Sequence, residues 1–443
     1  MLNTYSTKEN KRYYGEHLTP VDIFHRFIYP EIKDKLYNYI WIDLYAGKGN
    51  LILPILEKIP VNERINFFQK HIRLFDIQDE MVKHMINKVV KEYNIPLHIA
   101  KKFIQKRDNL KNFPLNLLKE NLPLFHITNP PYLYIGYIKK HQTENKYKKY
   151  LDYFTNGREK LQDLYQIALF NDLKANIKNM VYIIPTNFIY GKSGSNEIRK
   201  VFFPYYSIKK AYLIEDKIFE STGINVGIFF FQKKKQISYN AIEFPATKIY
   251  KNRSITKIIT LKKDYNYIAG NEFEEYVRNH KKNNLNISFY LMKDEVLNNK
   301  GNNKVILLNA NKYNKSKGEY EKEIYYVNDH LYKKIKSNIL WIRTVDTGSC
   351  NGRAGLYSIT DLGVDGIITE KPYRTHPIQI FFDPELSIEK QIKLKEEFNS
   401  CLEYLRELTD SEFMTTYKYS NSEYTRKYLG LSQVKKLIST LEL

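Results

Sequence analysis

Short apolar runs alternate with longer amphipathic stretches along the first 235 residues. Apolar runs bounded by turn-forming residues predict buried strands, whereas apolar positions three and four residues apart predict helices. The predicted strands are residues 39–44, 72–76, 122–128, 180–184, 211–214 and 226–231. The predicted helices are residues 49–58, 79–93 and 161–177. Strands that alternate with helices are typical of a parallel sheet covered by helices, so this part of the chain is predicted to be α/β.

The α/β pattern ends in a hairpin and a charge run. Residues 215–225 separate the last two predicted strands and can join them as a hairpin, so an antiparallel last strand is expected. Lys233 to Lys235 follow, and beyond them the apolar runs are shorter while Asn and Lys are more frequent. We therefore predict a boundary near residues 235–245. It separates an N-terminal domain, residues 1–240, from a C-terminal domain, residues 241–443.

The C-terminal domain has a weaker pattern. Residues 298–314 and 315–323 are polar and are predicted to be loops. Residues 388–408 are predicted to be helical, and residues 432–441 form a short amphipathic tail.

Composition narrows the class of protein. The chain has 443 residues and a net charge of +21, from 70 Lys and Arg against 49 Asp and Glu. This charge favours a polyanionic partner, either nucleic acid or an anionic membrane surface, although abundant Lys, Asn, Ile and Tyr are also typical of AT-rich genomes. Two cysteines, Cys350 and Cys401, are too few for a disulfide framework or a usual zinc site. No signal peptide and no run of about 20 apolar residues is seen, so we expect a cytoplasmic protein without a membrane partner.

Asn129-Pro130-Pro131-Tyr132 directly follows the predicted strand at residues 122–128. The Asn side-chain carbonyl is one hydrogen-bond acceptor, and the Pro130 carbonyl is a second because neither proline supplies an N–H. Tyr132 adds a flat face for stacking. Two acceptors and an aromatic plane suit the exocyclic amine of adenine. The alternative is a plain Pro-Pro turn that closes a strand.

A short glycine segment follows the first predicted strand. Gly47 and Gly49 allow a tight turn and a close approach of a ligand, and Asp43 precedes them. The segment lacks the third glycine of a dinucleotide fingerprint and the Ser or Thr of a phosphate loop. It therefore favours a ligand that carries an ammonium group, with a bare strand-to-helix turn as the alternative.

Two further acids follow in an ordered series. Asp76 ends the second predicted strand, where an acid can accept both hydroxyls of a ribose. Asp108 can meet the adenine amine of the same ligand. An acid of this kind, taken singly, is more often a solvated loop residue or a helix cap than a ligand contact. Their order along an alternating chain that ends at Asn129 favours a nucleoside ligand.

These motifs resemble the DNA adenine-N6 methyltransferases of restriction–modification type, in the arrangement with the cofactor motif first and the recognition domain last. The resemblance covers roughly residues 13–235. It includes five segments: residues 15–20 with Thr19, residues 43–51, residues 129–132, residues 163–165, and Phe219 on the predicted hairpin. Lys48 departs from the family, because a small residue usually stands between the two glycines.

The resemblance implies a fold, a cofactor and a set of site residues. The fold is a Rossmann-like domain with a seven-stranded, mostly parallel sheet, followed by an α+β target-recognition domain. The cofactor is S-adenosylmethionine, and no metal is implied. The implied cofactor residues are Thr19, Asp43, Tyr45, Gly47, Gly49, Asp76 and Asp108. The implied catalytic residues are Asn129, Pro130, Tyr132 and Phe219.

The implied reaction is a direct methyl transfer to a flipped adenine. Hydrogen bonds to Asn129 and to the Pro130 carbonyl favour a pyramidal amine whose lone pair faces the methyl group. Orientation of this kind can supply about 7–11 kcal/mol. Tyr132 and Phe219 are expected to stack on the extruded base.

The implied partner is double-stranded DNA, a cognate restriction endonuclease is a candidate partner, and we expect a monomer or a weak dimer. Residues 133–160 are basic and rich in Tyr, so they can reach DNA beside the flipped base or form a solvated surface. In the C-terminal domain, Gly-rich loops carry side chains that can bind base edges, so they are candidates for reading the DNA sequence. The alternative is that they are ordinary hairpins. Their residues are Gly348, Asn351, Gly352, Arg353, Gly355, Lys371, Tyr373, Arg374 and His376.

Three alternatives stay open. They are an RNA adenine methyltransferase, a protein glutamine methyltransferase, and a non-catalytic nucleic-acid-binding protein with a degenerate methylase domain. The intact Asp43, Gly47, Gly49 and Asn129 argue against the last of these.

Overall fold

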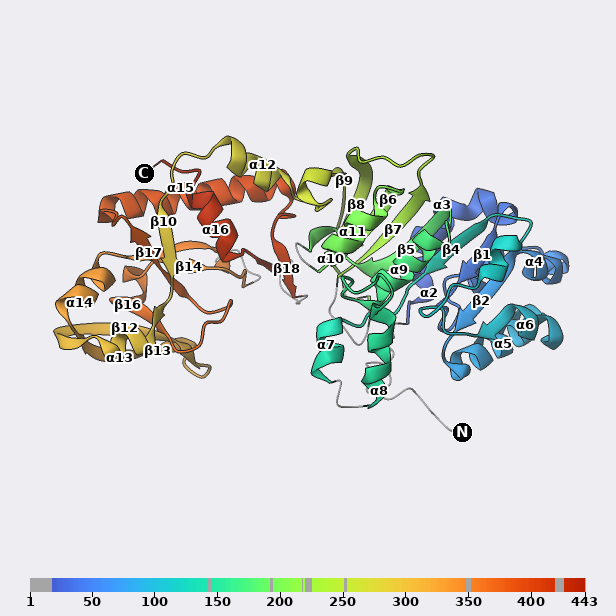
Figure 1. Ribbon diagram of the computed structural model, residues 1–443, viewed down its shortest axis with the longest axis horizontal. Helices are drawn as coiled ribbons and strands as arrows, with labels where there is room; N and C mark the ends of the chain where they lie inside the picture. Colours follow the sequence, from blue (N-terminus) through green and yellow to red (C-terminus); the bar gives the residue numbers. More distant parts are fainter. Residues whose placement is uncertain are drawn as a thin grey trace. The chain divides into compact units, whose positions relative to one another are not determined.

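The structure is a computed structural model, and it describes residues 18–141, 145–191, 194–216, 218–219, 225–250, 253–347, 352–418 and 426–442. The chain divides into two compact units, Met1–Ala269 and Gly270–Leu443 (Figure 1). Each unit has its own hydrophobic core. Among the described residues, none of the helices combines the length and the apolar character needed to cross a bilayer.

A nine-stranded sheet forms the centre of the first unit, in the order β3-β2-β1-β4-β5-β7-β6-β8-β9. Strands β1 to β5 run parallel to one another, and β7 is antiparallel to both β5 and β6. The predicted α/β arrangement and the antiparallel last strand of the hairpin are confirmed. The expected count of seven strands is wrong, because β8 and β9 extend the sheet. The strands are β1 Ile40–Asp43, β2 Ile72–Asp76, β3 Ile104–Lys106, β4 Leu124–Thr128, β5 Asn179–Pro185, β6 Tyr206–Ile214, β7 Val226–Lys233, β8 Ile242–Tyr250 and β9 Arg253–Leu261.

Helices pack beside the parallel strands. Figure 1 shows α4 Arg64–His71, α5 Asp79–Tyr93 and α6 Leu97–Phe103 beside β1 and β2. The predicted helix at residues 49–58 is only partly correct. A turn comes first and a 3₁₀ helix, η3 Leu53–Lys58, follows it, because Gly49 has a φ of +77° that a right-handed helix cannot include. Further helical segments of this unit are α7 Ile135–Lys140, α8 Asn145–Lys148, η6 Lys149–Phe154, α9 Leu164–Lys174 and α11 Asn196–Phe202.

The boundary expected at residue 240 falls inside the first unit. Strand β8 pairs in parallel with β6, with Ala211 opposite Ala246, and the Phe244 side chain is buried. Strand β9 is an edge strand whose first four residues are exposed, which explains the polar composition beyond residue 235. The compact units therefore divide at Ala269 and Gly270 instead.

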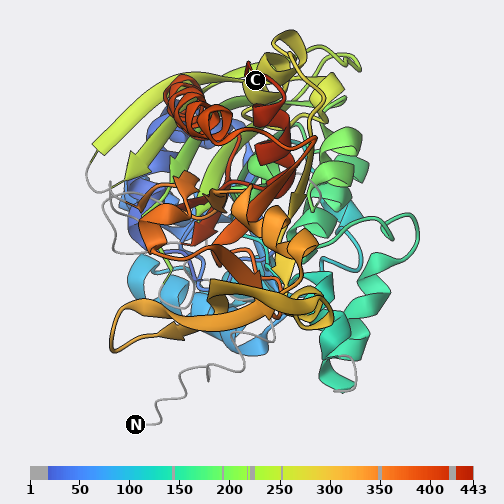
Figure 2. The ribbon, with the colours of Figure 1, turned by 90° about the vertical axis from the view of Figure 1, so that its left-hand side faces the viewer.

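The second unit contains two four-stranded sheets, β10-β17-β14-β15 and β11-β16-β12-β13, and a two-stranded pair. Figure 2 shows the β12–β13 hairpin at one side of this unit and the long helix α15 at another. The strands are β10 Asn286–Phe289, β11 Leu291–Met292, β12 Lys300–Asn314, β13 Glu319–Val327, β14 Leu340–Arg343, β15 Gly355–Ser358, β16 Gly366–Thr369, β17 Ile378–Asp383, β18 Thr415–Lys418 and β19 Arg426–Tyr428. The helices are α12 Glu272–Asn279, α13 Lys293–Asn298, α14 Asp329–Lys336, α15 Ile388–Thr409 and α16 Leu431–Ile438.

Two loop predictions in this unit are wrong, and the prediction of a helix at residues 388–408 is confirmed. The polar segments at 298–314 and 315–323 contain the hairpin of β12 and β13. The middle of β12 is buried, with Val305, Leu307 and Leu308 in the core, whereas both ends of β12 and nearly all of β13 are exposed or half-exposed. The average composition is therefore polar although the middle of the strand is buried. The predicted helix at 388–408 corresponds to α15.

Candidate functional site

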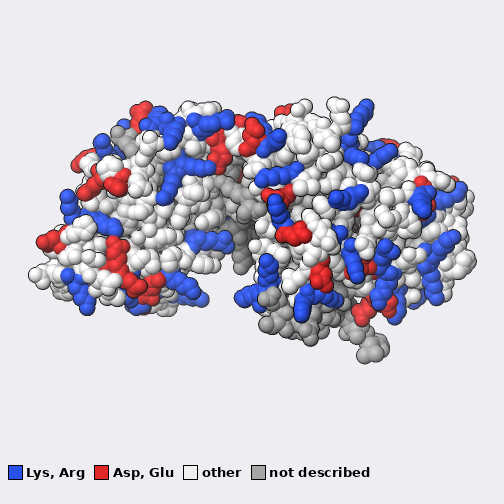
Figure 3. Space-filling view, in the orientation of Figure 1, with Lys and Arg blue, Asp and Glu red and all other residues white. Residues whose placement is uncertain are grey.

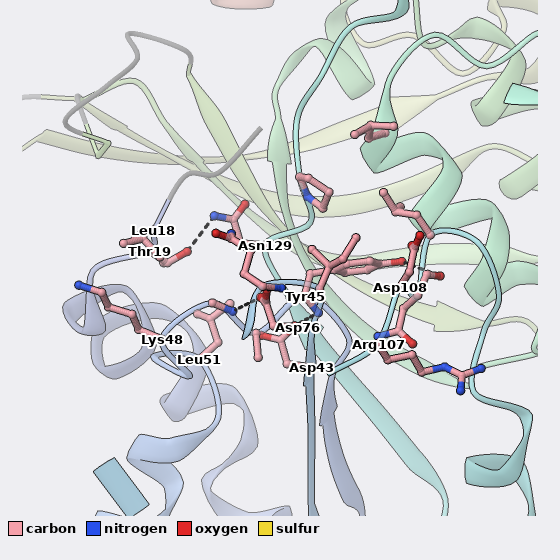
Figure 4. Close-up of a pocket in the computed structure, with 18 of the residues that line it drawn as sticks. Leu18, Thr19, Asp43, Tyr45, Lys48, Leu51, Asp76, Arg107, Asp108 and Asn129 are labelled. Carbon is pink, nitrogen blue, oxygen red and sulfur yellow. Dashed lines mark hydrogen bonds between the residues drawn. The ribbon is translucent and has the colours of Figure 1, made fainter. Parts of the chain in front are cut away.

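A pocket opens in the first unit where β1, β2 and β4 end (Figure 4). Its volume is about 850 Å³ with the open mouth included. The carboxyl ends of parallel strands are where ligands bind in α/β sheets. The lining includes Thr19, Asp43, Tyr45, Gly47, Lys48, Asp76, Arg107, Asp108, Asn109, Asn129, Pro131, Tyr150 and Tyr153.

The glycine turn packs too closely for larger residues. Gly47 and Gly49 have φ values of +54° and +77°, a region that side chains with a Cβ rarely adopt. A Cβ on Gly47 would lie 3.2 Å from the Leu18 side chain, and one on Gly49 would lie 2.6 Å from Leu53. Both glycines are therefore required by the turn that forms this wall of the pocket.

Asp43 is a buried carboxylate at the end of β1. Its Oδ1 accepts hydrogen bonds from the Thr128 hydroxyl at 2.7 Å and from the Tyr45 N–H at 3.0 Å. Burial raises the pKa of Asp43 to about 7, against the lowering effect of these two hydrogen bonds. A cation in the pocket would favour the ionised form of this carboxylate.

Asp76 connects β2 to the glycine turn. Its Oδ2 accepts a hydrogen bond from the Gly47 N–H at 2.8 Å, and its Oδ1 accepts one from the Gln78 N–H at 2.8 Å. A carboxylate is an acceptor-only group of the kind that binds ribose hydroxyls. The structure places Asp76 in the pocket, and its contact with a ribose stays a prediction.

Asp108 also lines the pocket, and a tyrosine that sequence reasoning did not single out contacts it. Its Oδ2 accepts a hydrogen bond from the Tyr153 hydroxyl at 2.5 Å, and its Oδ1 accepts one from the Lys111 N–H at 3.2 Å. Tyr153 and Tyr150 belong to η6 and line the pocket. Sequence reasoning missed both, because a Tyr-rich segment carries no local pattern that distinguishes a wall residue from a surface residue.

Asn129 is held on both sides of its amide. Its Nδ2 donates a hydrogen bond to the Thr19 hydroxyl at 2.9 Å, and its Oδ1 accepts one from the Tyr132 hydroxyl. The backbone carbonyl of Thr19 in turn accepts a hydrogen bond from Asn50 Nδ2 at 2.9 Å. The Asn129 amide therefore has a defined orientation at the pocket wall. Residues 15–17 of the expected N-terminal motif lie outside the described residues.

Tyr132 and Phe219 are neighbours but both are largely buried. Tyr132 is 7% exposed and Phe219 is 3% exposed, and their ring centroids are 6.4 Å apart in an edge-on arrangement. The Tyr132 hydroxyl also donates to the Ile183 carbonyl at 2.6 Å. Burial raises the pKa of Tyr132 well above its usual value, so its hydroxyl stays protonated. Pro130 is buried beside them.

Asp163 anchors the chain that leaves the Asn-Pro-Pro-Tyr turn. This residue is the N-cap of α9, and its Oδ1 also accepts a hydrogen bond from the Leu133 N–H at 3.0 Å. A β-bridge joins Tyr134 to Asp163. Residues 135–162 thus form an insertion that is closed at its base, and Figure 1 shows α7 and α8 standing out from the first unit.

Sequence reasoning missed a buried histidine, His126, which contacts the chain where the glycine turn begins. His126 Nε2 accepts a hydrogen bond from the Leu44 N–H at 3.2 Å, and Nδ1 donates one to Asp172 at 2.5 Å. The Tyr182 hydroxyl donates to the same Asp172 oxygen at 2.7 Å. These partners define a neutral imidazole with its proton on Nδ1. The network links β4, β5 and α9 to the start of the turn.

On the face that Figure 3 draws, basic side chains are distributed rather than gathered in one patch. Figure 3 shows Lys and Arg over the visible face of both units, with Asp and Glu among them. In the insertion, Lys139, Lys140, Lys148 and Lys149 are exposed. In the second unit, residues 371–374 are exposed, Arg353 pairs with Glu403 at 2.8 Å, and Gly348 and Asn351 lie outside the described residues.

The described part of the chain shows no group of three acidic, His or Cys side chains arranged for a metal ion.

Comparisons with known proteins give distant structural likenesses. A scan against protein-family models gives no match, and a search of curated proteins gives no significant match. The type IIL restriction-modification enzyme MmeI is 11% identical with a TM-score of 0.49, over 85% of this chain and 64% of MmeI. The type IIG restriction endonuclease BpuSI is 11% identical with a TM-score of 0.44, over 96% of this chain and 59% of BpuSI.

A type I restriction-modification methyltransferase subunit from Streptococcus thermophilus is 15% identical with a TM-score of 0.33, over 54% of this chain and 49% of the subunit. The chain therefore spans less than two thirds of each of these three proteins. With TM-scores below 0.5, these likenesses do not decide the function of the chain.

Proposed function

We propose that this protein transfers a methyl group from S-adenosylmethionine to the N6 amine of adenine in duplex DNA, within a restriction–modification system. One observation carries the proposal. A single pocket brings the buried Asp43 and the acid Asp76 together with Asn129, whose amide is held in one orientation. One cavity thus contains two acids that can bind a cation, Asp43 and Asp76, and an amide that can accept a hydrogen bond from an amine, Asn129.

The pocket residues fit the chemistry of the cofactor. S-adenosylmethionine carries a sulfonium, an ammonium, a ribose and an adenine, and it supplies an electrophilic methyl group when it is bound. Asp43 favours the positive charges, Asp76 can accept ribose hydroxyls, and Asp108 can accept the adenine amine. The glycine turn beside these acids has a backbone conformation that only glycine adopts readily at residues 47 and 49.

Asn129 and Pro130 act on the target amine. One lone pair of Asn129 Oδ1 accepts the Tyr132 hydroxyl, and the second can accept an amine hydrogen. The Pro130 carbonyl is the other proposed acceptor. Together they orient the amine and favour the positive charge that develops on nitrogen as the new N–C bond forms.

DNA is the proposed substrate because the chain carries a net charge of +21 and the insertion that follows the Asn-Pro-Pro-Tyr turn in the sequence presents exposed lysines. An adenine inside a duplex must be flipped, which costs a few kcal/mol. Stacking by Tyr132 and Phe219 requires one face of each ring to open, because both rings are largely buried. The second unit is the proposed target-recognition unit, with the exposed residues 371–374 as one candidate reading segment.

The test is single-turnover methyl transfer from labelled S-adenosylmethionine to duplex DNA, with nucleoside analysis of the product. We expect N6-methyladenine, and a rate about 10²–10³-fold lower for Asn129→Ala, the cost of one lost charge-stabilising hydrogen bond. Asn87→Ala, an exposed position on α5, is the matched control and should keep the wild-type rate. Methyl groups on cytosine, RNA or protein instead would overturn the assignment of the substrate.

A further inference from the structure

Lys48 is the cation at the glycine-turn end of the pocket. It stands between Gly47 and Gly49, is half-buried, and lines the cavity. Figure 4 shows its side chain running away from Asp43 and Asp76, on the side of Leu18 and Thr19. Within the part of the chain that the structure describes, the Lys48 ammonium has no hydrogen-bond or ion-pair partner.

The charges of the pocket are ordered along its length. Figure 4 shows Lys48 at one end, Asp43 and Asp76 in the middle, and Arg107 with Asp108 at the other end. Of the two cations in the lining, only Lys48 lies on the Thr19 side.

The proposed cofactor has two arms that leave its sulfonium in different directions. The sulfonium carries the methyl group, so the proposed reaction requires it to lie beside Asn129. Its adenosyl arm is assigned to Asp76 and Asp108. The amino-acid arm therefore extends into the remaining end of the pocket, which Lys48 and Thr19 line. Its carboxylate is repelled by the carboxylates of Asp43 and Asp76, which favours the same end.

We propose that the Lys48 ammonium binds the carboxylate of the ligand's amino-acid group, so that the pocket selects a zwitterionic amino acid on the sulfonium. This inference rests on the proposed function and adds a carboxylate subsite to it. The two neighbouring glycines hold the Lys48 backbone in the wall of the pocket, and the flexible four-carbon side chain can direct its charge toward the ligand.

The experiment compares two ligands in the full chain by calorimetry: S-adenosylmethionine and its decarboxylated analogue, which keeps the sulfonium, the ammonium and the adenosine. We expect the wild type to prefer the intact ligand by about 10- to 100-fold, the range of a charge-assisted hydrogen bond. Lys48→Met should bind the intact ligand correspondingly more weakly and should bind the decarboxylated ligand as well as before or better. Lys48→Arg should keep the preference.

Arg107→Met is the matched control, because it removes one positive charge from the opposite end of the same pocket. It should leave the preference between the two ligands unchanged. If the wild type binds S-adenosylmethionine but Lys48→Met keeps the full preference, or loses affinity for both ligands equally, the carboxylate subsite is wrong. If the wild type binds neither ligand, the proposed function itself fails.

Discussion

The side chains of Thr19 and Asn129, 110 positions apart in the sequence, are joined by a hydrogen bond of 2.9 Å from Asn129 Nδ2 to Thr19 Oγ1. This contact directs the opposite atom of the amide, Oδ1, toward the Tyr132 hydroxyl. This contact predicts a positioning role for Thr19, in addition to the cofactor contact that the resemblance implies.

Thr19→Ala should slow methyl transfer by about 5- to 10-fold, because an Asn129 amide without this acceptor can rotate. Thr19→Ser keeps the hydroxyl and should restore most of the rate. Single-turnover kinetics measure the rate, and calorimetry measures cofactor affinity in parallel. Equal rates for the Ala and Ser variants would show that the hydrogen bond does not orient Asn129.

Tyr132→Phe distinguishes a stacking role from an anchoring role. A purely stacking tyrosine would tolerate the change, since phenylalanine keeps the flat face. Here the hydroxyl also donates to the buried Ile183 carbonyl at 2.6 Å. We therefore expect the free energy of unfolding to fall by about 1–3 kcal/mol, the cost of an unsatisfied buried acceptor. Urea unfolding measures it, and an unchanged midpoint would contradict the anchoring role.

Binding of a cationic ligand should release a proton from Asp43 near neutral pH. The pKa of this carboxyl is raised to about 7 by burial, and an added positive charge lowers it. Calorimetry of S-adenosylmethionine binding at about pH 7, in two buffers of different ionisation enthalpy, should report a fraction of one proton released. Asp43→Asn should bind more weakly and release none, whereas identical heats in both buffers for the wild type would contradict the prediction.

The free protein should lose stability as the pH rises toward neutrality. Burial raises the pKa of Asp43 and of Asp163 from 3.8 to about 7. Such a group stabilises the folded state below its unfolded pKa, and that contribution is lost as the pH rises through the folded value. Urea midpoints measured between about pH 5 and about pH 8 should decline, less steeply in Asp163→Asn. Exposed Asp79→Asn is the control and should keep the wild-type slope.

Lys139→Glu with Lys140→Glu should weaken DNA binding and reduce its dependence on salt. Both side chains are exposed in the last turn of α7. Each phosphate contact that is lost should lower the slope of log K against log salt by about 1. Lys101→Glu with Lys102→Glu, an exposed pair in the last turn of α6, is the matched control. Equal effects of the two pairs would show that only net charge matters.

Local patterns were sufficient for much of the first unit. The predicted bounds of β2 and α5 match the structure, because a continuous apolar run and a helical period are properties of neighbouring residues. The meeting of Asp43, Asp76 and Asn129 also followed from the sequence, since parallel strands end at one edge of a sheet.

Contacts between distant segments needed the tertiary structure. Tyr153 reaches Asp108 across 45 positions, and His126 reaches Asp172 across 46. The pairing of β8 with β6 moved the boundary to residue 269. Such contacts depend on which strands pair and on how helices pack against them. Hydrophobic periodicity is a property of adjacent residues, so it does not determine these long-range pairings.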